Sequence, residues 1–121
     1  MEKNSEQFFD IVESYRETLV IVEGLKDRRA LQEFGFRRIL ILNKPLYAVV
    51  EDIVATGERV VVILADLDAE GKKLYSYLAN HLMQHGIVVN NTLRNFLFKK
   101  TPIRHIEGLA TYFCATSGAG E

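Results

Sequence analysis

The sequence predicts a single α/β domain with a central, mainly parallel sheet of about four strands that is flanked by helices. The apolar runs 19–22 and 59–65 are short and rich in β-branched residues, as buried parallel strands are. Stretches with the apolar spacing of helices alternate with such runs, which is typical of a parallel sheet with crossover helices. A chain of 121 residues has room for one compact core and not for two ordinary domains.

The first predicted element is an amphipathic helix over 6–18, with Asn4 or Ser5 as its candidate N-cap. Its apolar stripe consists of Phe8, Ile11, Val12 and Tyr15. We expect this helix, within residues 1–18, to pack on a domain that spans 19–113. The small, Gly-rich end of the chain at 114–121 is expected to be a flexible tail.

Glycine and proline mark the ends of the helices that follow. Gly35, Gly57 and Gly86 each come just after a stretch with helical spacing, where a C-cap glycine is common, and Pro45 suits a helix start. Helices are predicted at 26–34, 45–56, 70–84, 92–98 and 109–113. Strands are predicted at 19–22, 38–42, 59–65 and 87–89, with a further candidate strand at 102–106.

Acidic residues follow the two most apolar strands. Glu23 comes directly after 19–22, and Asp66 and Asp68 come directly after 59–65. The carboxyl ends of parallel strands meet at one edge of a sheet, and ligands bind there in open α/β folds. Because three carboxylates held together repel one another unless a cation such as Mg²⁺ lies among them, the pattern indicates metal-assisted chemistry on phosphates.

The residues around these acids resemble two motifs of the Toprim family. Glu23-Gly24-Leu25-Lys26-Asp27 is similar to the family's EGxxD, and Asp66-Leu67-Asp68-Ala69-Glu70-Gly71 fits its DxDxxG. The family includes topoisomerases of types IA and II, bacterial-type primases, overcoming-lysogenization nucleases, recombination mediators and the 5S ribosomal RNA maturase. The resemblance runs from about Leu19 to Tyr112, so the chain looks like a small stand-alone Toprim protein. It implies a Rossmann-like fold with the first and third strands adjacent in mid-sheet.

The resemblance also implies roles for the acids. Asp66 and Asp68 would bind Mg²⁺, or alternatively Mn²⁺, and Glu23 would be a further ligand or a general acid or base. A purely structural alternative makes the aspartates helix-capping residues and Glu23 an ion-pair partner of a nearby base. Asp27 matches the second acid of the first motif, but it could equally serve the dipole of its helix.

Glycines and basic residues near the motifs are candidate phosphate-binding groups. Gly24 would let the backbone approach a phosphate, and Gly71 would relieve crowding where the loop enters the helix. Lys26, Arg28 and Arg29 lie beside the first motif, Lys72 and Lys73 lie beside the second, and Lys44 follows the second strand. A late basic stretch would join them if it lay on the same side; it contains Arg94, Lys99, Lys100 and Arg104. The alternative is that these charges form ordinary solvated faces.

The histidines give a weaker signal. His81 and His85 are one helical turn apart, but the sequence between them is not the HExxH of zinc enzymes, so both are expected to be structural. The segment His105-Ile106-Glu107-Gly108 has a faint likeness to the 5S ribosomal RNA maturase branch. The likeness is too short to assign a role to Glu107.

The leading functional hypothesis is a Mg²⁺-dependent nuclease or RNA-processing enzyme that acts on RNA or DNA. The alternative is a non-catalytic nucleic-acid-binding adaptor in a repair or RNA-processing complex, with protein partners. A small-molecule phosphotransferase or phosphatase is a third, weaker hypothesis. Topoisomerase or primase activity would need further domains. Net charge is −1, so composition alone gives no sign of nucleic-acid binding.

Localisation is expected to be cytoplasmic, without a membrane partner. No apolar stretch reaches the length of a membrane span, and the start lacks the pattern of a signal peptide. The single cysteine, Cys114, cannot form an internal disulfide, which suits a reducing compartment.

Overall fold

The computed structural model describes residues 2–113, so the expected tail at 114–121 and Cys114 lie outside the described residues. Its centre is a four-stranded parallel sheet in the order β2-β1-β3-β4. The strands are β1 (Leu19–Val22), β2 (Ile39–Ile41), β3 (Val60–Ile63) and β4 (Val88–Val89). The predicted parallel sheet, with the first and third strands adjacent at its centre, is confirmed.

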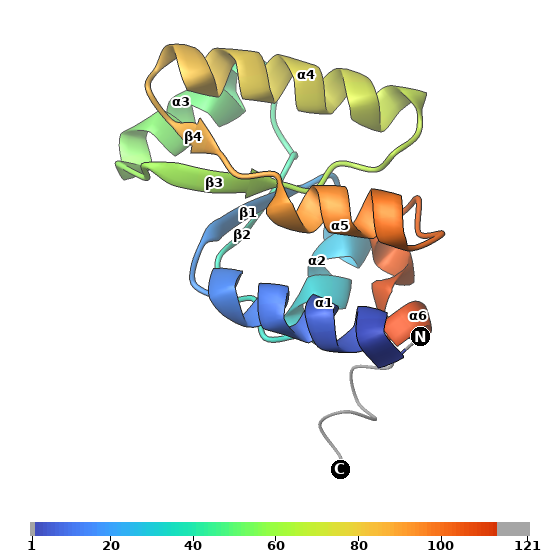
Figure 1. Ribbon diagram of the computed structural model, residues 1–121. Helices are drawn as coiled ribbons and strands as arrows, with labels where there is room; N and C mark the ends of the chain where they lie inside the picture. The colour runs from blue at the N-terminus through green and yellow to red at the C-terminus, as the bar shows by residue number, and fades with distance from the viewer. Residues whose placement is uncertain (1, 114–121) are drawn as a thin grey trace.

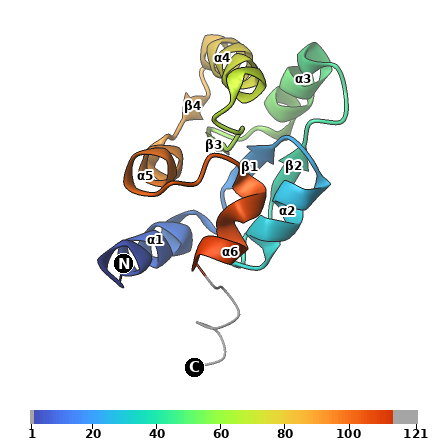
Figure 2. The same cartoon turned by 90° about the vertical axis from the view of Figure 1, so that its right-hand side faces the viewer.

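Helices cover both faces of this sheet (Figure 1). They are α1 (Glu2–Tyr15), α2 (Leu25–Gln32), α3 (Leu46–Thr56), α4 (Ala69–Gln84), α5 (Thr92–Lys100) and α6 (Leu109–Phe113), with a short 3₁₀ helix η1 (Ile106–Gly108). The helices α3 and α4 lie on one face, and α1, α2, α5 and α6 lie on the other (Figure 2). The arrangement is Rossmann-like, with one small domain and a three-layer section.

The side chains of the two central strands alternate between the two halves of the core. On β1, Val20 and Val22 pack with the α1, α2, α5 and α6 layer, and Ile21 packs with α3 and α4. On β3, Val62 likewise packs with the α1, α2, α5 and α6 layer, and Ile63 packs with α3 and α4. Because both faces are covered, these strands need apolar residues at every position, and this explains why they read as continuous apolar runs.

The N-terminal helix is part of the core. Phe8 of α1 is fully buried, and its ring stacks on Phe113 of α6 with centroids 3.9 Å apart. The ring of Phe34, just after α2, meets the Phe8 ring edge-on, with centroids 5.1 Å apart. The first and last described helices are therefore joined through one aromatic cluster, as the predicted packing of the first helix requires.

Several predicted boundaries are wrong. The segment 102–106 is not a strand, because Pro102 has no N–H to donate and Ile106 already begins η1. Asn4 and Ser5 lie inside α1 rather than at its N-cap, and α5 continues to Lys100. The predicted helix ends at Gly57 and Gly86 are confirmed, with φ of 79° and 80°.

Within residues 2–113, no helix is both long enough and apolar enough to cross a membrane.

Candidate metal and phosphate site

Three segments that are distant in sequence meet at the carboxyl edge of the sheet, which faces the viewer in Figure 2. They are the turn after β1, the turn after β3 and the segment between α5 and η1. The first two leave neighbouring strands, since β1 pairs with β3 in parallel. The third is tied to the second by a hydrogen bond from the Leu67 N–H to the Arg104 carbonyl, 2.9 Å long.

Glu23 joins the two central strands at this edge. Its Oε2 accepts a hydrogen bond of 2.7 Å from the backbone N–H of Asp66. Burial raises the pKa of the Glu23 carboxyl; the Asp66 N–H bond opposes that rise, and the negative charges of Asp66, Asp68 and Asp27 add to it. The side chain is therefore closer to taking up a proton than an exposed glutamate would be.

Asp66 and Asp68 are each held through one oxygen. Asp66 Oδ1 accepts from the Ile106 N–H at 2.9 Å. Asp68 Oδ1 accepts from the Gly71 N–H at 2.7 Å and so caps α4. The structural alternative for Asp68 is therefore correct for one oxygen, but capping leaves its second oxygen, Oδ2, facing a different neighbour.

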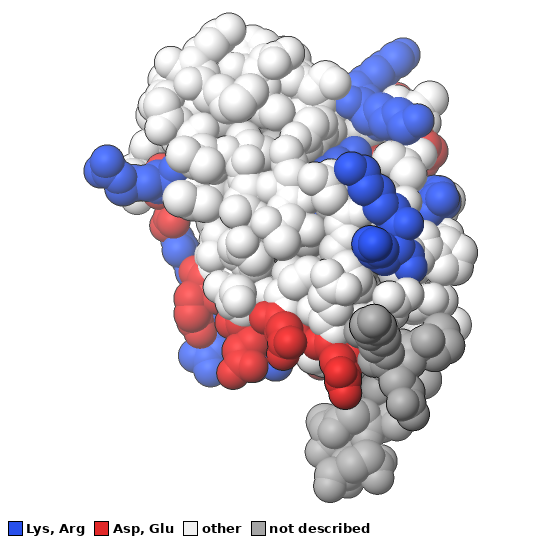
Figure 3. All heavy atoms as spheres, viewed as in Figure 1, with Lys and Arg blue, Asp and Glu red and all other residues white. Residues whose placement is uncertain are grey.

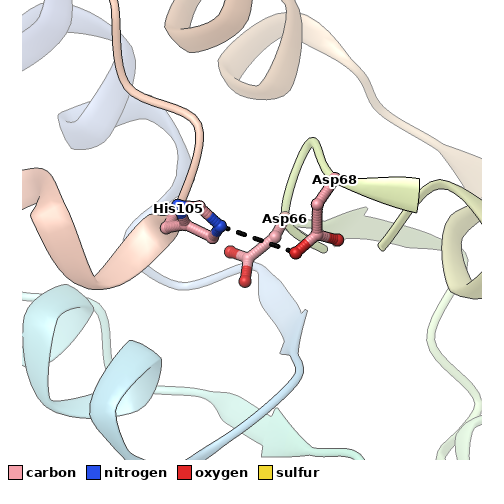
Figure 4. Close-up of side chains that lie close together, drawn as sticks. All are labelled: Asp66, Asp68 and His105. Carbon is pink, nitrogen blue, oxygen red and sulfur yellow. Dashed lines mark ion pairs between the residues drawn. The ribbon is translucent and has the colours of Figure 1, made fainter. Parts of the chain in front are cut away.

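That neighbour is His105, whose Nε2 lies 3.5 Å from Asp68 Oδ2. Asp66, Asp68 and His105 each offer a ligand atom, and these atoms all lie within 4.8 Å of one another (Figure 4). Among the described residues this is the group whose spacing suits a metal ion, and Glu23 does not belong to it. Sequence reasoning assigned no role to His105, because only the chain path after α5 brings it to the aspartates.

An open cleft of about 460 Å³ adjoins the carboxylates. It is lined by Glu23, Gly24, Leu25, Lys26, Asp27, Arg29, Asp66 and Glu107. Lys26 and Arg29 supply positive charge along one part of a cleft that is otherwise strongly acidic. Arg29, on α2, is one of the basic residues that the sequence places beside the first motif. Glu107, on η1, was given no role from the sequence.

Asp27 and Gly24 act together at the start of α2. The buried Asp27 accepts a 3.0 Å hydrogen bond from the Gly24 N–H, which is half of a capping box. Burial first and then the charge of Asp66 raise the Asp27 pKa. A Cβ placed on Gly24 would meet no described atom within 4 Å, and its φ of −151° suits any residue, so the local fold does not require glycine there.

At Gly71, in contrast to Gly24, the fold leaves no room for a side chain. A Cβ at this position would lie 2.0 Å from the carbonyl oxygen of Asp66 and 2.9 Å from its backbone nitrogen. The first turn of α4 therefore packs directly on the backbone that carries the aspartates. This agrees with the predicted relief of crowding.

Basic side chains gather near this edge, over the start of α4 and the end of α5 (Figure 3). Lys72 on α4 and Lys99 and Lys100 on α5 are exposed. Lys44 follows β2 at the same edge, but its Nζ lies 2.7 Å from Asp52 Oδ2, so its charge is already paired.

Arg94 departs from the expected surface role. It is only 8% exposed, its Nη1 donates a 2.7 Å hydrogen bond to the Ala65 carbonyl, and its guanidinium lies over the Tyr75 ring at 4.3 Å. Burial lowers the Arg94 pKa, while attraction to Tyr75, Asp66 and Glu23 opposes that change. It is a fixed positive charge behind the carboxylates rather than a phosphate-binding group on the surface.

Relatives of this chain are found among archaeal proteins. It is similar to the UPF0292 protein of Methanocaldococcus jannaschii, with 29% identity over 115 residues that make up 88% of this chain and 90% of the relative. The UPF0292 protein of Thermoplasma volcanium is 32% identical over 96 residues, 78% of this chain and 81% of the relative. That of Pyrococcus abyssi is 31% identical over 119 residues, 95% of this chain and 90% of the relative.

A solved structure described as a putative protein from Aquifex aeolicus has the same fold, with a TM-score of 0.73 and 30% identity. The match covers 84% of this chain and 94% of that one. No family model matches the sequence. Since the relatives at 31% and 32% identity are matched over 90% and 81% of their own length, the chain belongs to the UPF0292 family.

Proposed function

We propose that this protein is a Toprim-type, metal-dependent enzyme that processes nucleic-acid phosphodiesters, as a nuclease or an RNA-processing enzyme. The proposal rests on the arrangement of side chains where the two central strands, β1 and β3, end side by side. There a glutamate with a raised pKa is bonded to the backbone of Asp66, next to a group of ligands of metal-binding spacing. A general acid or base beside a divalent cation is the combination of groups that can catalyse phosphodiester cleavage.

The donor set fits a divalent cation, Mg²⁺ or Mn²⁺. Asp66 and Asp68 would hold it, because carboxylate oxygens are its preferred protein ligands and Mg²⁺ needs only one or two of them beside water and phosphate. When bound, such a cation would offset the negative charge that develops on the phosphate oxygens in the transition state.

Glu23 would act as the general base. Its carboxylate would take a proton from the attacking water as the water oxygen bonds to phosphorus and the bond from phosphorus to the leaving sugar oxygen breaks, and that oxygen would then take a proton from solvent water. The raised pKa makes this carboxylate a stronger base than an exposed one, and its hydrogen bond to Asp66 fixes it beside the ligands. Because Glu23 lies outside the closest ligand group, we favour this role over metal binding.

The surroundings suit a polyanion. Lys26 and Arg29 line the cleft, and further basic side chains lie over the start of α4 and the end of α5 (Figure 3); these groups would bind phosphates on either side of the scissile bond. The open Gly24 would admit a phosphate to the start of α2. We further propose that the protein works in the cytoplasm on RNA or DNA, alone or with protein partners of a processing or repair complex.

A cleavage assay on labelled single- and double-stranded RNA and DNA, with Mg²⁺ or Mn²⁺, tests the proposal. Glu23→Gln should lower the rate by about 100-fold or more, since its amide oxygen can still accept from Asp66 but cannot take a proton. Asp66→Asn should lower the rate and also weaken metal binding. Asp10→Asn, an exposed change on α1, is the matched control and should cleave at the rate of the parent.

Equal cleavage by the parent and all three variants would indicate a contaminating nuclease and refute the enzymatic proposal. Oligonucleotide binding without metal-dependent cleavage in the parent would favour the non-catalytic adaptor instead.

A further inference from the structure

We propose that His105 is a direct ligand of the metal, so that the site selects a divalent first-row transition cation such as Mn²⁺ over Mg²⁺. This inference rests on the proposed function and goes beyond it, because the two aspartates alone would suit Mg²⁺. Neither of the two acidic motifs at the site contains a histidine.

The fold holds His105 on the aspartate turn from both sides. Before it, the Arg104 carbonyl accepts a 2.9 Å hydrogen bond from the Leu67 N–H. After it, the Ile106 N–H donates to Asp66 Oδ1 at 2.9 Å. Both hydrogen bonds join the segment between α5 and η1 to the turn that starts at Asp66, so the fold holds His105 next to the turn that carries the two aspartates (Figure 4).

The spacing is compatible with two ligands of one ion and is long for a hydrogen bond. Two donors about 2.1 Å from a shared cation are about 3.4 Å apart at a tetrahedral angle and about 3.0 Å apart at a right angle. The 3.5 Å from His105 Nε2 to Asp68 Oδ2 is close to the first value and longer than the second, so a six-coordinate ion such as Mn²⁺ would draw the two atoms closer together. All three ligand atoms lie within 4.8 Å of one another, so a shared ion would need the most distant pair to move closer.

The donor types decide which cation is favoured. Mg²⁺ binds oxygen donors and gives up water reluctantly, so an imidazole adds little to its affinity. Imidazole nitrogen binds first-row transition cations well, and a mixed nitrogen and carboxylate set with open positions is typical of such ions. Open positions would remain for phosphate oxygens, as the proposed reaction requires.

The competing interpretation is a simple surface ion pair between a protonated His105 and Asp68. The two side chains are 55% and 46% exposed, and pairs as exposed as this contribute little to stability. That interpretation predicts no contact between the imidazole nitrogen and a bound metal.

Electron paramagnetic resonance of Mn²⁺ added to the full chain distinguishes the two. Nitrogen-14 modulation of the bound Mn²⁺ signal should be present in the parent and absent in His105→Ala. The protein has three histidines, and His85→Ala is the matched control, because His85 lies at the end of α4 with its Nδ1 already 2.9 Å from the His81 carbonyl. It should keep the modulation.

Calorimetric titration gives the second measurement. His105→Ala should bind Mn²⁺ at least about tenfold more weakly while its Mg²⁺ affinity changes much less, and Asp66→Asn should bind both cations more weakly. An unchanged melting temperature of His105→Ala would show that its weaker binding does not come from unfolding.

Two outcomes separate this inference from the proposed function. Mn²⁺ binding with no nitrogen coupling, or with equal affinity in His105→Ala, would overturn the inference and leave the proposed function standing. No uptake of either cation at millimolar concentration, with or without a single-stranded oligonucleotide, would overturn both.

Discussion

Glu23 is a carboxyl whose ionisation the fold makes difficult. Burial and three acidic neighbours raise its pKa above the ordinary 4.5. Between the ordinary and the raised pKa the folded state binds more protons than the unfolded state, so the free energy of unfolding falls as pH rises through that window. At neutral pH this residue therefore lowers stability, which suits a group kept for its chemistry.

Replacing Glu23 should therefore stabilise the protein at neutral pH. Glu23→Gln removes the buried charge and keeps an acceptor for the Asp66 N–H, so its melting temperature at pH 7 should exceed that of the parent. The difference should shrink as pH falls and reach its minimum well below the ordinary pKa of 4.5, where Glu23 is protonated in both the folded and the unfolded state. Glu13→Gln on the exposed face of α1 is the control for removal of one charge. A difference that stays constant with pH would contradict this explanation.

The junction between β3 and α4 is the element on which the geometry of the site depends most. Asp68 caps α4, and Gly71 allows the helix to lie against the Asp66 backbone, so the end of the strand and the start of the helix form one unit. The Arg94 bond to the Ala65 carbonyl fixes the same unit from α5. The position of the aspartates is thus set by backbone packing rather than by side-chain contacts alone.

Gly71→Ala should lower the free energy of unfolding by about 2 kcal/mol or more, since the new methyl would meet backbone that can move only with the strand. Gly24→Ser is the matched control: no described atom lies within 4 Å of the position, and serine is a good N-cap, so stability should change by less than about 0.5 kcal/mol. Urea denaturation measures both. A similar destabilisation of the two variants would show that glycine is needed at both motifs for folding.

Charge is unevenly distributed over the whole molecule. The net charge is −1, yet basic side chains lie over the start of α4 and the end of α5, and acidic side chains gather along the lower left of the view in Figure 3. A nucleic acid that approaches the carboxylates would meet the basic edge. Binding would therefore depend on where a charge lies and not on the total.

Charge reversal at two matched positions tests this. Lys72→Glu should weaken binding of a single-stranded oligonucleotide and lower the slope of log affinity against log salt by about 0.7 for each phosphate that the lysine would otherwise neutralise. Arg37→Glu makes the same change in net charge just before β2, at the opposite edge, where Arg37 pairs with Glu17. Its affinity should stay close to that of the parent. Equal weakening would mean that only total charge matters.

Local sequence pattern was enough to predict the parallel α/β fold, the order of its main elements and the position of Glu23, Asp66 and Asp68 at one edge of the sheet. The adjacency of β1 and β3, which brings Glu23 to the aspartates, was predicted from the resemblance to the Toprim family. A central parallel strand must be apolar on both faces, and its next polar residue emerges at the ligand-binding edge, so these features can be inferred without long-range information. The helix ends at Gly57 and Gly86 were equally predictable, since positive φ is a local requirement.

The remainder of the site depends on how distant segments pack in three dimensions. His105 and Arg94 lie about 40 and 30 positions from the β3 turn, and nothing in their local sequence fixes where α5 and its following segment pack. The same limit explains why the strand predicted at 102–106 is wrong. The sheet of the described residues does not include this segment. Contacts between distant segments depend on the whole core, and a periodic pattern carries no information about them.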